Sequence, residues 1–320
     1  MAKKFFSFIV LIRALAAIII TNSHYTGVYP TDLIANGGLL GDVLFFAVSG
    51  FCIANTSGSF LKWYVKRLLR VYVPMWMLRI VYILLGIFVL TGWKDIIKLF
   101  IFPQDWHFVS SIILLYIPLF FVSKYVEMNI RNYRLIAVGL FLLQLLLYAF
   151  VYDFSFYHID TVREPMIEFL FFQSMLLGVH FRWRCENESR MDTFNVWKVG
   201  ICVILCVLYF TSKLFFVSTP SIAPFQILNQ VLLFGLLYVI FDIFMSLEDR
   251  LNKHDDGWVW KSLTFISDRT LEIYLVQYVI IANCNIGPFP INWLILTFAI
   301  LASAVALRFG SQLLITRIKI

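Results

Sequence analysis

A long stretch near the end of the chain, Ile273 to Leu307, contains no acidic or basic residue. A helix crosses the hydrocarbon core of a bilayer, about 30 Å thick, with about 20 apolar residues. The stretch is therefore long enough for two crossings, and it divides at residues 283–290, because the glycine and prolines there interrupt helices. Hydrophobic residues make up 61% of the 320 and charged residues 14%, a balance typical of membrane proteins and foreign to soluble domains.

Ten charge-poor segments of this kind can be marked. The predicted fold class is an all-α polytopic membrane protein with about ten transmembrane helices and both termini cytoplasmic. The predicted spans are 5–27, 37–56, 73–91, 108–123, 135–152, 165–181, 198–217, 224–245, 262–282 and 291–313. In this orientation most of the 26 lysines and arginines fall in cytoplasmic segments, as the positive-inside rule requires. We expect a single integral-membrane domain over residues 1–320, because the loops are too short to hold a soluble one.

Composition also argues against a disulfide framework, a metal site and a nucleic-acid partner. The five cysteines lie mostly in apolar runs, where cysteine behaves as a small hydrophobic residue, so neither a disulfide framework nor a metal site is predicted. The net charge of +7 is explained by basic residues in short loops beside anionic lipid, and no nucleic-acid partner is needed. A solvated position is expected for the acidic and histidine residues in or beside the loops: Glu248, Asp249, Asp255, Asp256, His158, His180 and His254.

The first predicted span contains Arg13 and His24, and ionisable residues inside a membrane are costly and mark function. They are eleven residues apart, about 16 Å and close to three turns, hence on nearly the same face of a helix. A neutral imidazole, with an ordinary pKa near 6.5, can accept the proton of a hydroxyl that attacks an acyl carbonyl. We predict that His24 is a general base. The alternative is a histidine bonded to Asn22 or Tyr25 and packed at the interface.

A basic cluster precedes the third predicted span. Arg67 and Arg70 are neighbours on a helix, and Lys62, Lys66 and Arg70 form a row alongside them. Arginine binds phosphates through forked hydrogen bonds, and coenzyme A carries phosphates on the cytoplasmic side, where this segment is predicted to lie. The cluster is predicted to bind coenzyme A; alternatively it sets orientation and binds anionic headgroups.

Two carboxylates in the predicted spans are further candidates. Glu272 lies near the middle of the ninth predicted span, three residues after Arg269, and is strongly disfavoured there unless it is paired. It is predicted either to orient His24 or to pair with Arg269. Asp42, at the outer end of the second span, could orient the imidazole instead.

Four other residues have more than one interpretation. Ser49 and Gly50 are interpreted as a site of close helix approach, with a serine nucleophile as the alternative. Arg79 and Arg308, both within predicted spans, are expected to pair inside the bundle, to extend to the interface or to contact substrate.

Four stretches, in this order, resemble motifs of the membrane-bound acyltransferase 3 family, which O-acylates bacterial surface polysaccharides. They are RALAAIIITNSH (13–24), GDVLFFAVSGF (41–51), RLLRVYVP (67–74) and RTLEIYLVQ (269–277). The motifs cover the first quarter of the chain and a short piece near its end. Gln277 stands where many members have the histidine of a Tyr-Leu-x-His segment, which puts a role for that position in doubt.

The resemblance implies a bacterial inner-membrane enzyme that moves an acyl group, expected to be acetyl, from cytoplasmic acetyl-coenzyme A to a hydroxyl of a lipid-linked or surface polysaccharide. No metal is expected. The implied catalytic residues are His24, Glu272 and Asp42, and the implied donor-binding residues are Arg13, Arg67 and Arg70. A lipid-linked glycan flippase, a small-molecule transporter or a non-catalytic assembly subunit are the alternatives. Succinyl transfer and N-acetylation stay open within the enzyme class.

Overall fold

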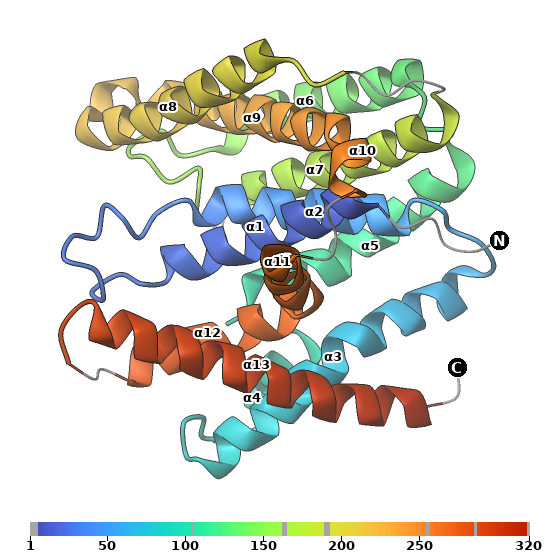
Figure 1. Cartoon of the computed structure of the whole chain (residues 1–320). Helices are drawn as coiled ribbons and strands as arrows, with labels where there is room; N and C mark the ends of the chain where they lie inside the picture. Colours follow the sequence, from blue (N-terminus) through green and yellow to red (C-terminus); the bar gives the residue numbers. More distant parts are fainter. Residues whose placement is uncertain are drawn as a thin grey trace. The chain divides into compact units, whose positions relative to one another are not determined.

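The structure of the chain, a computed structural model, describes residues 6–103, 105–161, 165–188, 193–253, 257–284 and 287–318. These residues form helices joined by loops, with no β-strand among them (Figure 1). The all-α prediction is confirmed. The longer helices are α1 (Ser7–Ser23), α2 (Gly38–Ile53), α3 (Phe60–Leu84), α5 (His107–Tyr125), α6 (Ile130–Val151), α7 (Pro165–Asn187), α8 (Val196–Ser218), α9 (Ile227–Ser246), α11 (Trp258–Asp268), α12 (Thr270–Asn283) and α13 (Ile291–Arg317). The short elements are α4 (Trp93–Ile96), η1 (Ile97–Ile101), η2 (Pro220–Phe225) and α10 (Glu248–Leu251).

Among the residues that the structure describes, five helices are long and apolar enough to cross a membrane: α5, α6, α8, α9 and α13. Three more, α1, α2 and α12, are apolar but only 17, 16 and 14 residues long. The chain is thus a multi-pass membrane protein by the length and composition of its helices. The count of ten spans and the cytoplasmic side of both termini stay predictions, and residues 1–5 and 319–320 lie outside the described part of the chain.

The third helix starts earlier than the sequence predicts. We expected a basic loop ahead of a span at residue 73, whereas α3 begins at Phe60 and continues through Pro74 to Leu84. Pro74 removes only one backbone N–H donor, a loss that apolar helices tolerate when their neighbours and local adjustments compensate. Arg67 and Arg70 therefore lie on a regular helix, which is the geometry that their three-residue spacing assumed.

The ninth predicted span, 262–282, is two helices instead of one. The break falls at Arg269, whose backbone leaves the helical region at φ −114° and ψ 15°. Beside it the Thr270 hydroxyl donates to the carbonyl of Ser267 at 2.9 Å, and such local bonds compete with the helix. The 14 residues of α12 reach about 21 Å, less than the hydrocarbon core.

The contacts between residues divide the chain into two compact units. Unit 1 comprises Met1–Arg13, Asp42–Thr56 and Pro118–Leu263, and unit 2 comprises Ala14–Gly41, Ser57–Ile117 and Thr264–Ile320. The expectation of one membrane domain over residues 1–320 stays a prediction.

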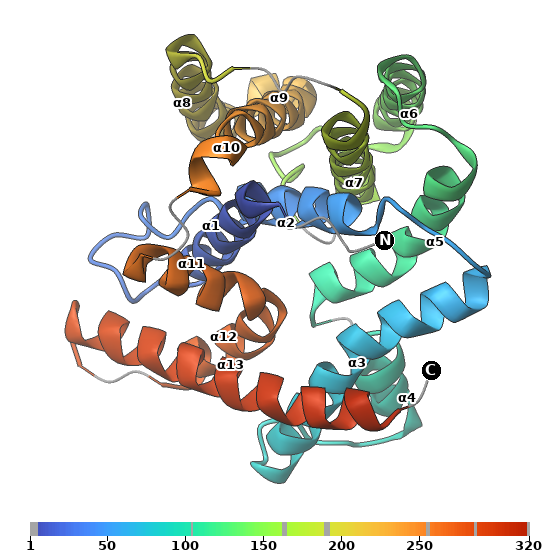
Figure 2. The same cartoon turned by 45° about the vertical axis from the view of Figure 1, so that its right-hand side comes forward.

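In unit 1, α6, α7, α9 and α8 pack in that order, as the row of helices in Figure 2 shows. α2 crosses α7 with backbones almost touching. A Cβ added at Gly50 would lie 2.0 Å from the carbonyl oxygen of Met175, and one at Gly178 would lie 1.8 Å from that of Ala47. The interpretation of Gly50 as a site of close helix approach is confirmed, and Gly178 supplies the other half of the crossing.

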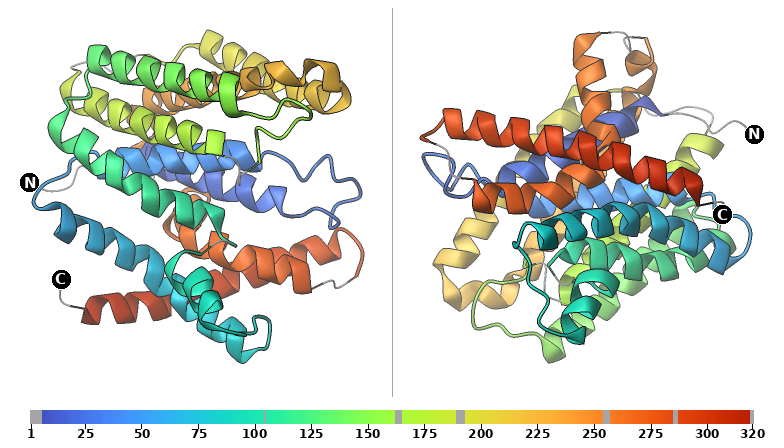
Figure 3. Two further views of the ribbon diagram at one scale, coloured as in Figure 1. Left: turned by 180° about the vertical axis from the view of Figure 1, so that it is seen from behind. Right: turned by 90° about the horizontal axis from the view of Figure 1, so that it is seen from below.

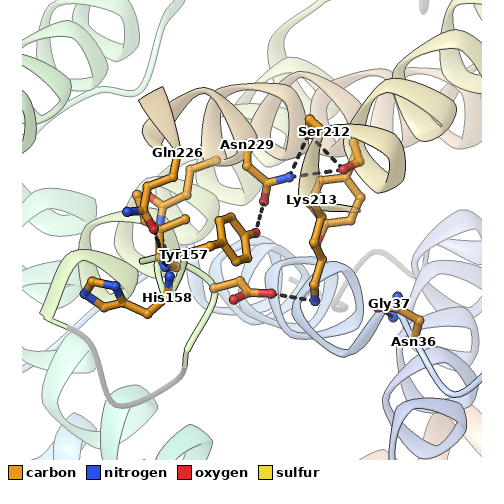
Figure 4. A network of polar contacts seen from close by, with 12 residues as sticks. Asn36, Gly37, Tyr157, His158, Ser212, Lys213, Gln226 and Asn229 are labelled. Carbon is orange, nitrogen blue, oxygen red and sulfur yellow. Dashed lines mark hydrogen bonds and ion pairs between the residues drawn. The ribbon is translucent and has the colours of Figure 1, made fainter. Parts of the chain in front are cut away.

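The loop after α6 is tied to α8 and α9 by side-chain amides (Figure 4). The oxygen Oε1 of Gln226 accepts the backbone N–H groups of His158 and Ile159 at 2.9 and 3.0 Å. Asn229 accepts the Tyr157 hydroxyl at 3.1 Å and donates to Ser212 Oγ at 2.9 Å. These amides stand in for backbone partners that an irregular segment lacks, so the loop is fixed as part of the bundle.

Three residues predicted to be solvated are buried. His158 is 8% exposed and His180 1%, and the His180 ring stacks on Tyr133 and bonds to the Met128 carbonyl through Nδ1 at 2.9 Å. Glu248 is 6% exposed. The solvated position was predicted from polarity alone, which does not reveal a specific partner inside the bundle. Two of the acidic residues and one histidine of that prediction, Asp255, Asp256 and His254, lie outside the described residues.

In unit 2, α13 packs along α12 and α3, and α12 also contacts α3, an arrangement seen from two sides in Figure 3. A Cβ on Gly310 of α13 would lie 2.5 Å from Cε of Met77 on α3, so a flexible side chain of one helix fills the notch that glycine leaves in the other. The residues of α1 that belong to this unit, from Ala14 onward, bear the polar end that leads to His24.

Candidate active site

His24 follows the last residue of α1, Ser23, in a turn closed by its own N–H, which donates to the Thr21 carbonyl at 3.1 Å. The helix ends here because the chain reverses beyond it: Gly27 adopts φ 76°, a left-handed conformation that favours glycine. The amide of Asn22 donates to the carbonyl of Ile34 at 2.7 Å and so binds the returning loop to the helix end. The predicted span 5–27 is therefore a shorter helix, and His24 lies in the turn directly after its end.

A cavity of about 480 Å³ opens beside His24 within unit 2. The Tyr278 ring meets the His24 ring edge-on, with 6.1 Å between centroids. The cavity is lined by Ser23, His24, Thr26, Gly27, Val28, Tyr278, Ile281, Ala282, Cys284 and Asn292. Its lining mixes polar side chains, among them Ser23, His24 and Asn292, with apolar ones, so it offers both hydrogen-bonding groups and apolar surface to a small molecule.

The alternative partners proposed for His24 are engaged elsewhere. Asn22 accepts the Tyr29 hydroxyl at 2.8 Å, and the hydroxyl of Tyr25 is bonded to Oγ1 of Thr297 at 2.7 Å. Among the residues that the structure describes, none forms a hydrogen bond to the His24 ring. The imidazole is therefore available to a molecule in the cavity.

Gln277 links α12 to the end of α1. It is 0% exposed, and its Oε1 accepts the hydroxyl of Thr21 at 2.7 Å. Thr21 lies one turn before His24, so this bond fixes the part of α1 from which the histidine extends. The sequence left Gln277 without a role and did not indicate Thr21, although its position three residues before His24 was a usable signal.

Glu272 is 7% exposed and forms an ion pair with Arg308 of α13, with 3.9 Å between Oε2 and Nη1. Neither of the predicted partners, His24 and Arg269, is in this pair, and Arg269 instead donates from Nη1 to the carbonyl of Phe265 at 2.9 Å. Glu272 is six residues before Tyr278, about 9 Å along α12, and does not line the cavity. The expectation that Arg308 pairs inside the bundle is confirmed.

The other two predicted residues of the first motifs belong to unit 1. Asp42, in the first turns of α2, is 7% exposed and is not among the residues that line the cavity. The Nη2 group of Arg13 donates to Sγ of Cys52 at 3.1 Å. A catalytic role for Asp42 and a donor-binding role for Arg13 stay predictions.

The basic row lies along the first half of α3. Lys62, Lys66 and Arg70 are exposed on the helix, and the guanidinium of Arg67 lies 5.5 Å from the ring centroid of Trp63. Stacking of this kind orients a planar cation, which favours forked contacts to a phosphate. In the described part of the chain no group of three or more histidine, cysteine, aspartate or glutamate residues is placed to hold a metal ion.

Comparison with known proteins gives one family. The acyltransferase 3 family, described as an acyltransferase domain, matches residues 6–309. The searches of curated proteins and of solved structures found no match. The matched region takes in both motifs of the first two helices, the basic row of α3 and the whole of α12. The chain therefore belongs to the acyltransferase 3 family and is a multi-pass membrane acyltransferase.

Proposed function

We propose that this protein moves an acyl group, with acetyl as the expected one, from cytoplasmic acyl-coenzyme A to a hydroxyl of a lipid-linked or surface polysaccharide at the bacterial inner membrane. The observation that carries the proposal is the position of His24, on the wall of a cavity of about 480 Å³ and without a hydrogen-bonding partner on its ring in the described protein. A base must have a free ring nitrogen within reach of the proton that it removes.

The reaction that fits this position is an acyl transfer with His24 as general base. The imidazole takes the proton of the acceptor hydroxyl while that oxygen forms a bond to the thioester carbonyl carbon. When the tetrahedral intermediate collapses, the carbon–sulfur bond breaks, and the imidazolium returns the proton to the departing thiolate. Atoms and charge balance, since the products are an ester and coenzyme A, and no further reactant is needed.

The donor is proposed to bind at Arg67 and Arg70, and Arg13, which belongs to unit 1, is a further proposed donor-binding residue. The basic row of α3 offers both forked and point-charge contacts to the phosphates of coenzyme A. From there the pantetheine arm would carry the thioester towards His24. Glu272 and Asp42 are the proposed supporting carboxylates; in the structure Glu272 pairs with Arg308, so we propose that it holds α12, and with it Tyr278, in position beside the cavity.

The test is transfer of labelled acetyl from acetyl-coenzyme A to extracted lipid-linked glycans by purified protein. We expect label with the wild type and a loss of about 10²-fold or more with His24→Ala and His24→Gln, since general base catalysis supplies that range. Size-exclusion profiles and thermal melting establish that the variants fold. Full transfer by a folded His24→Ala variant would exclude the base assignment, and no transfer by the wild type with any of several acyl donors would exclude the reaction.

Donor binding is tested separately. Binding of labelled coenzyme A should weaken about tenfold or more in Arg67→Ala/Arg70→Ala, because each charge-assisted hydrogen bond contributes about 1.5–3 kcal/mol. Lys98→Ala, which removes an exposed charge from η1, is the control and should bind normally. Equal binding by both variants would rule out a donor site on α3.

A further inference from the structure

The most deeply buried charge in unit 2 is Arg79, one turn before the end of α3. Its side chain is 0% exposed, and it is the bulkiest fully buried side chain of the described protein. Burying a guanidinium in a membrane protein is expensive, and such residues face partners or a pathway inside the bundle. The role assigned to α3 above, donor binding at Arg67 and Arg70, does not use it.

Aromatic rings and one carboxylate surround the guanidinium. Its carbon Cζ lies 3.9 Å from the ring centroid of Trp106 and 4.5 Å from that of Phe88. Nη2 donates to Oδ2 of Asp105 at 3.1 Å. The Asp105 side chain is 55% exposed, so the ion pair that the described residues form with Arg79 joins a fully buried cation to a largely exposed anion.

Most of the donors of Arg79 are unused. A guanidinium has five N–H donors, and of its three nitrogens Nε and Nη1 are buried without a hydrogen-bond partner. The hydroxyl of Tyr82, one turn further along α3, is likewise buried and unpartnered. Unmet hydrogen bonds in a buried cation are among the costliest features that a protein keeps. Three such groups from adjacent turns of one helix indicate a binding site.

We propose that Arg79 and Tyr82 form a subsite for an oxyanion of the acceptor, a phosphate of its lipid carrier or a carboxylate of its sugar, which replaces Asp105 on the guanidinium. The contact with Asp105 shows that the guanidinium of Arg79 binds a carboxylate oxygen. Because that side chain is more than half exposed, its return to water costs little, whereas the ligand gains the donors that Asp105 leaves unused. The identification of the oxyanion as part of the acceptor rests on the proposed function.

This subsite is distinct from the predicted donor site. Arg79 is nine residues beyond Arg70, about 14 Å along α3, and the helix between them is continuous. An anion held at Arg79 and one held at the basic row therefore respond to different substitutions.

The experiment is calorimetric titration of the purified full-length protein in detergent with two probes, inorganic pyrophosphate and glucuronate. We expect Arg79→Gln to weaken binding of the better probe about tenfold or more, because a charge-assisted pair is lost. Asp105→Asn should strengthen binding several-fold, because the competing anion is removed while Arg79 remains. Lys98→Gln makes the same change of net charge as Arg79→Gln at an exposed position in the same unit and should leave binding unaltered.

The Asp105→Asn variant keeps the test decisive if Arg79→Gln does not fold. Weaker or unchanged anion binding in Asp105→Asn would mean that the ion pair only supports the fold, and the subsite would be withdrawn, as it would if neither probe bound the wild type. The probe that responds to both substitutions identifies the phosphate or the carboxylate as the ligand group. The titration does not depend on acyl transfer, which the labelled-acetyl assay measures separately. Anion binding in a protein that transfers no acetyl would overturn the proposed reaction alone. Acetyl transfer by a protein that does not bind the anions would overturn the subsite alone.

Discussion

His24 is held in position by its neighbours in the turn, and no residue in the described part of the chain forms a hydrogen bond to its ring. The bond from Thr21 to Gln277 fixes the last turn of α1. The cavity beside His24 is where a ligand would contact the imidazole. This arrangement separates positioning from chemistry, because substitutions at Thr21 change where the base lies without altering the base itself. The same separation gives Gln277 a positioning role, because its side chain bonds to α1.

A double-mutant cycle at Thr21 and Gln277 tests this link. Thr21→Val should lower stability by about 1–3 kcal/mol, because it leaves the buried Oε1 of Gln277 without a donor in addition to the unpartnered Nε2. Adding Gln277→Leu should recover much of that loss, since both polar groups are then gone. Thermal melting of the four proteins in one detergent measures the coupling. Strictly additive effects would show that the bond contributes nothing.

The pair between Glu272 and Arg308 is a second prediction at this scale. Glu272→Ala should lower stability by about 1–3 kcal/mol, less than for a fully buried pair, because the charged atoms are 3.9 Å apart and the Arg308 side chain is 28% exposed. Arg269→Ala is the matched control and should have little effect through Glu272. If Arg269→Ala lowered the stability more than Arg308→Ala, the ion-pair partner of Glu272 would be Arg269, as the sequence suggested, and not Arg308.

At the scale of helices, α1 depends on a residue far away in the sequence. The Glu248 carboxylate accepts the N–H groups of Ser7 and Phe8 at 3.0 and 2.8 Å. It satisfies two of the donors that a helix start leaves open and places a negative charge at the positive end of the helix dipole. We expect Glu248→Ala to cost about 1–2 kcal/mol in thermal unfolding, and Asp249→Ala, at the exposed neighbour, to cost almost nothing. Similar losses in both would refute the cap.

The crossing of α2 and α7 gives the sharpest packing prediction. In Gly178→Ala the new Cβ would lie 1.8 Å from the carbonyl oxygen of Ala47, so the helices must separate, at a cost of about 1–3 kcal/mol or more. Gly200→Ala on α8, where nothing lies within 4 Å of the new atom, should instead be neutral or stabilising by up to about 1 kcal/mol. Melting temperatures in detergent separate the two, and an unchanged Gly178→Ala protein would contradict the close crossing.

The bounds of a helix could be predicted from the sequence where they depend on the length of an apolar, uncharged run. They could not be predicted where they depend on local hydrogen bonds. Runs such as those of α6, α8 and α9 need only hydrophobicity, and their predicted ranges agree with the structure to within several residues. The break at Arg269 and the early start of α3 depend on a threonine hydroxyl and on tolerance of Pro74, which hydropathy does not record. His24 could be selected as a candidate because the sequence pattern places an ionisable residue in an apolar segment, whereas Tyr278 and Asn292 line its cavity from later helices and resemble ordinary interface residues.

For the whole molecule, the orientation in the membrane decides whether the basic row of α3 can meet cytoplasmic coenzyme A. The sequence predicts that the start of α8 and the end of α9 lie on the cytoplasmic side, because Lys198, Arg250 and Lys253 adjoin them. Lys213, near the other end of α8, runs against the rule, but in the structure it is paired with Asp160, which lowers the cost of leaving it on the outside.

Reporter fusions test this orientation. A phosphatase fused after Ser218, at the end of α8, should be active on the outer side of the membrane, and a fluorescent protein fused after Ser246, at the end of α9, should fluoresce on the cytoplasmic side. Fluorescent proteins on the two ends of the full chain should both fluoresce, since an even number of crossings returns the chain to its starting side. Ends on opposite sides would require an odd number of crossings. Reversal of both internal reporters would place the opposite end of α3 towards the cytoplasm, so that Arg67 and Arg70 could not be the donor site even if His24 proved essential.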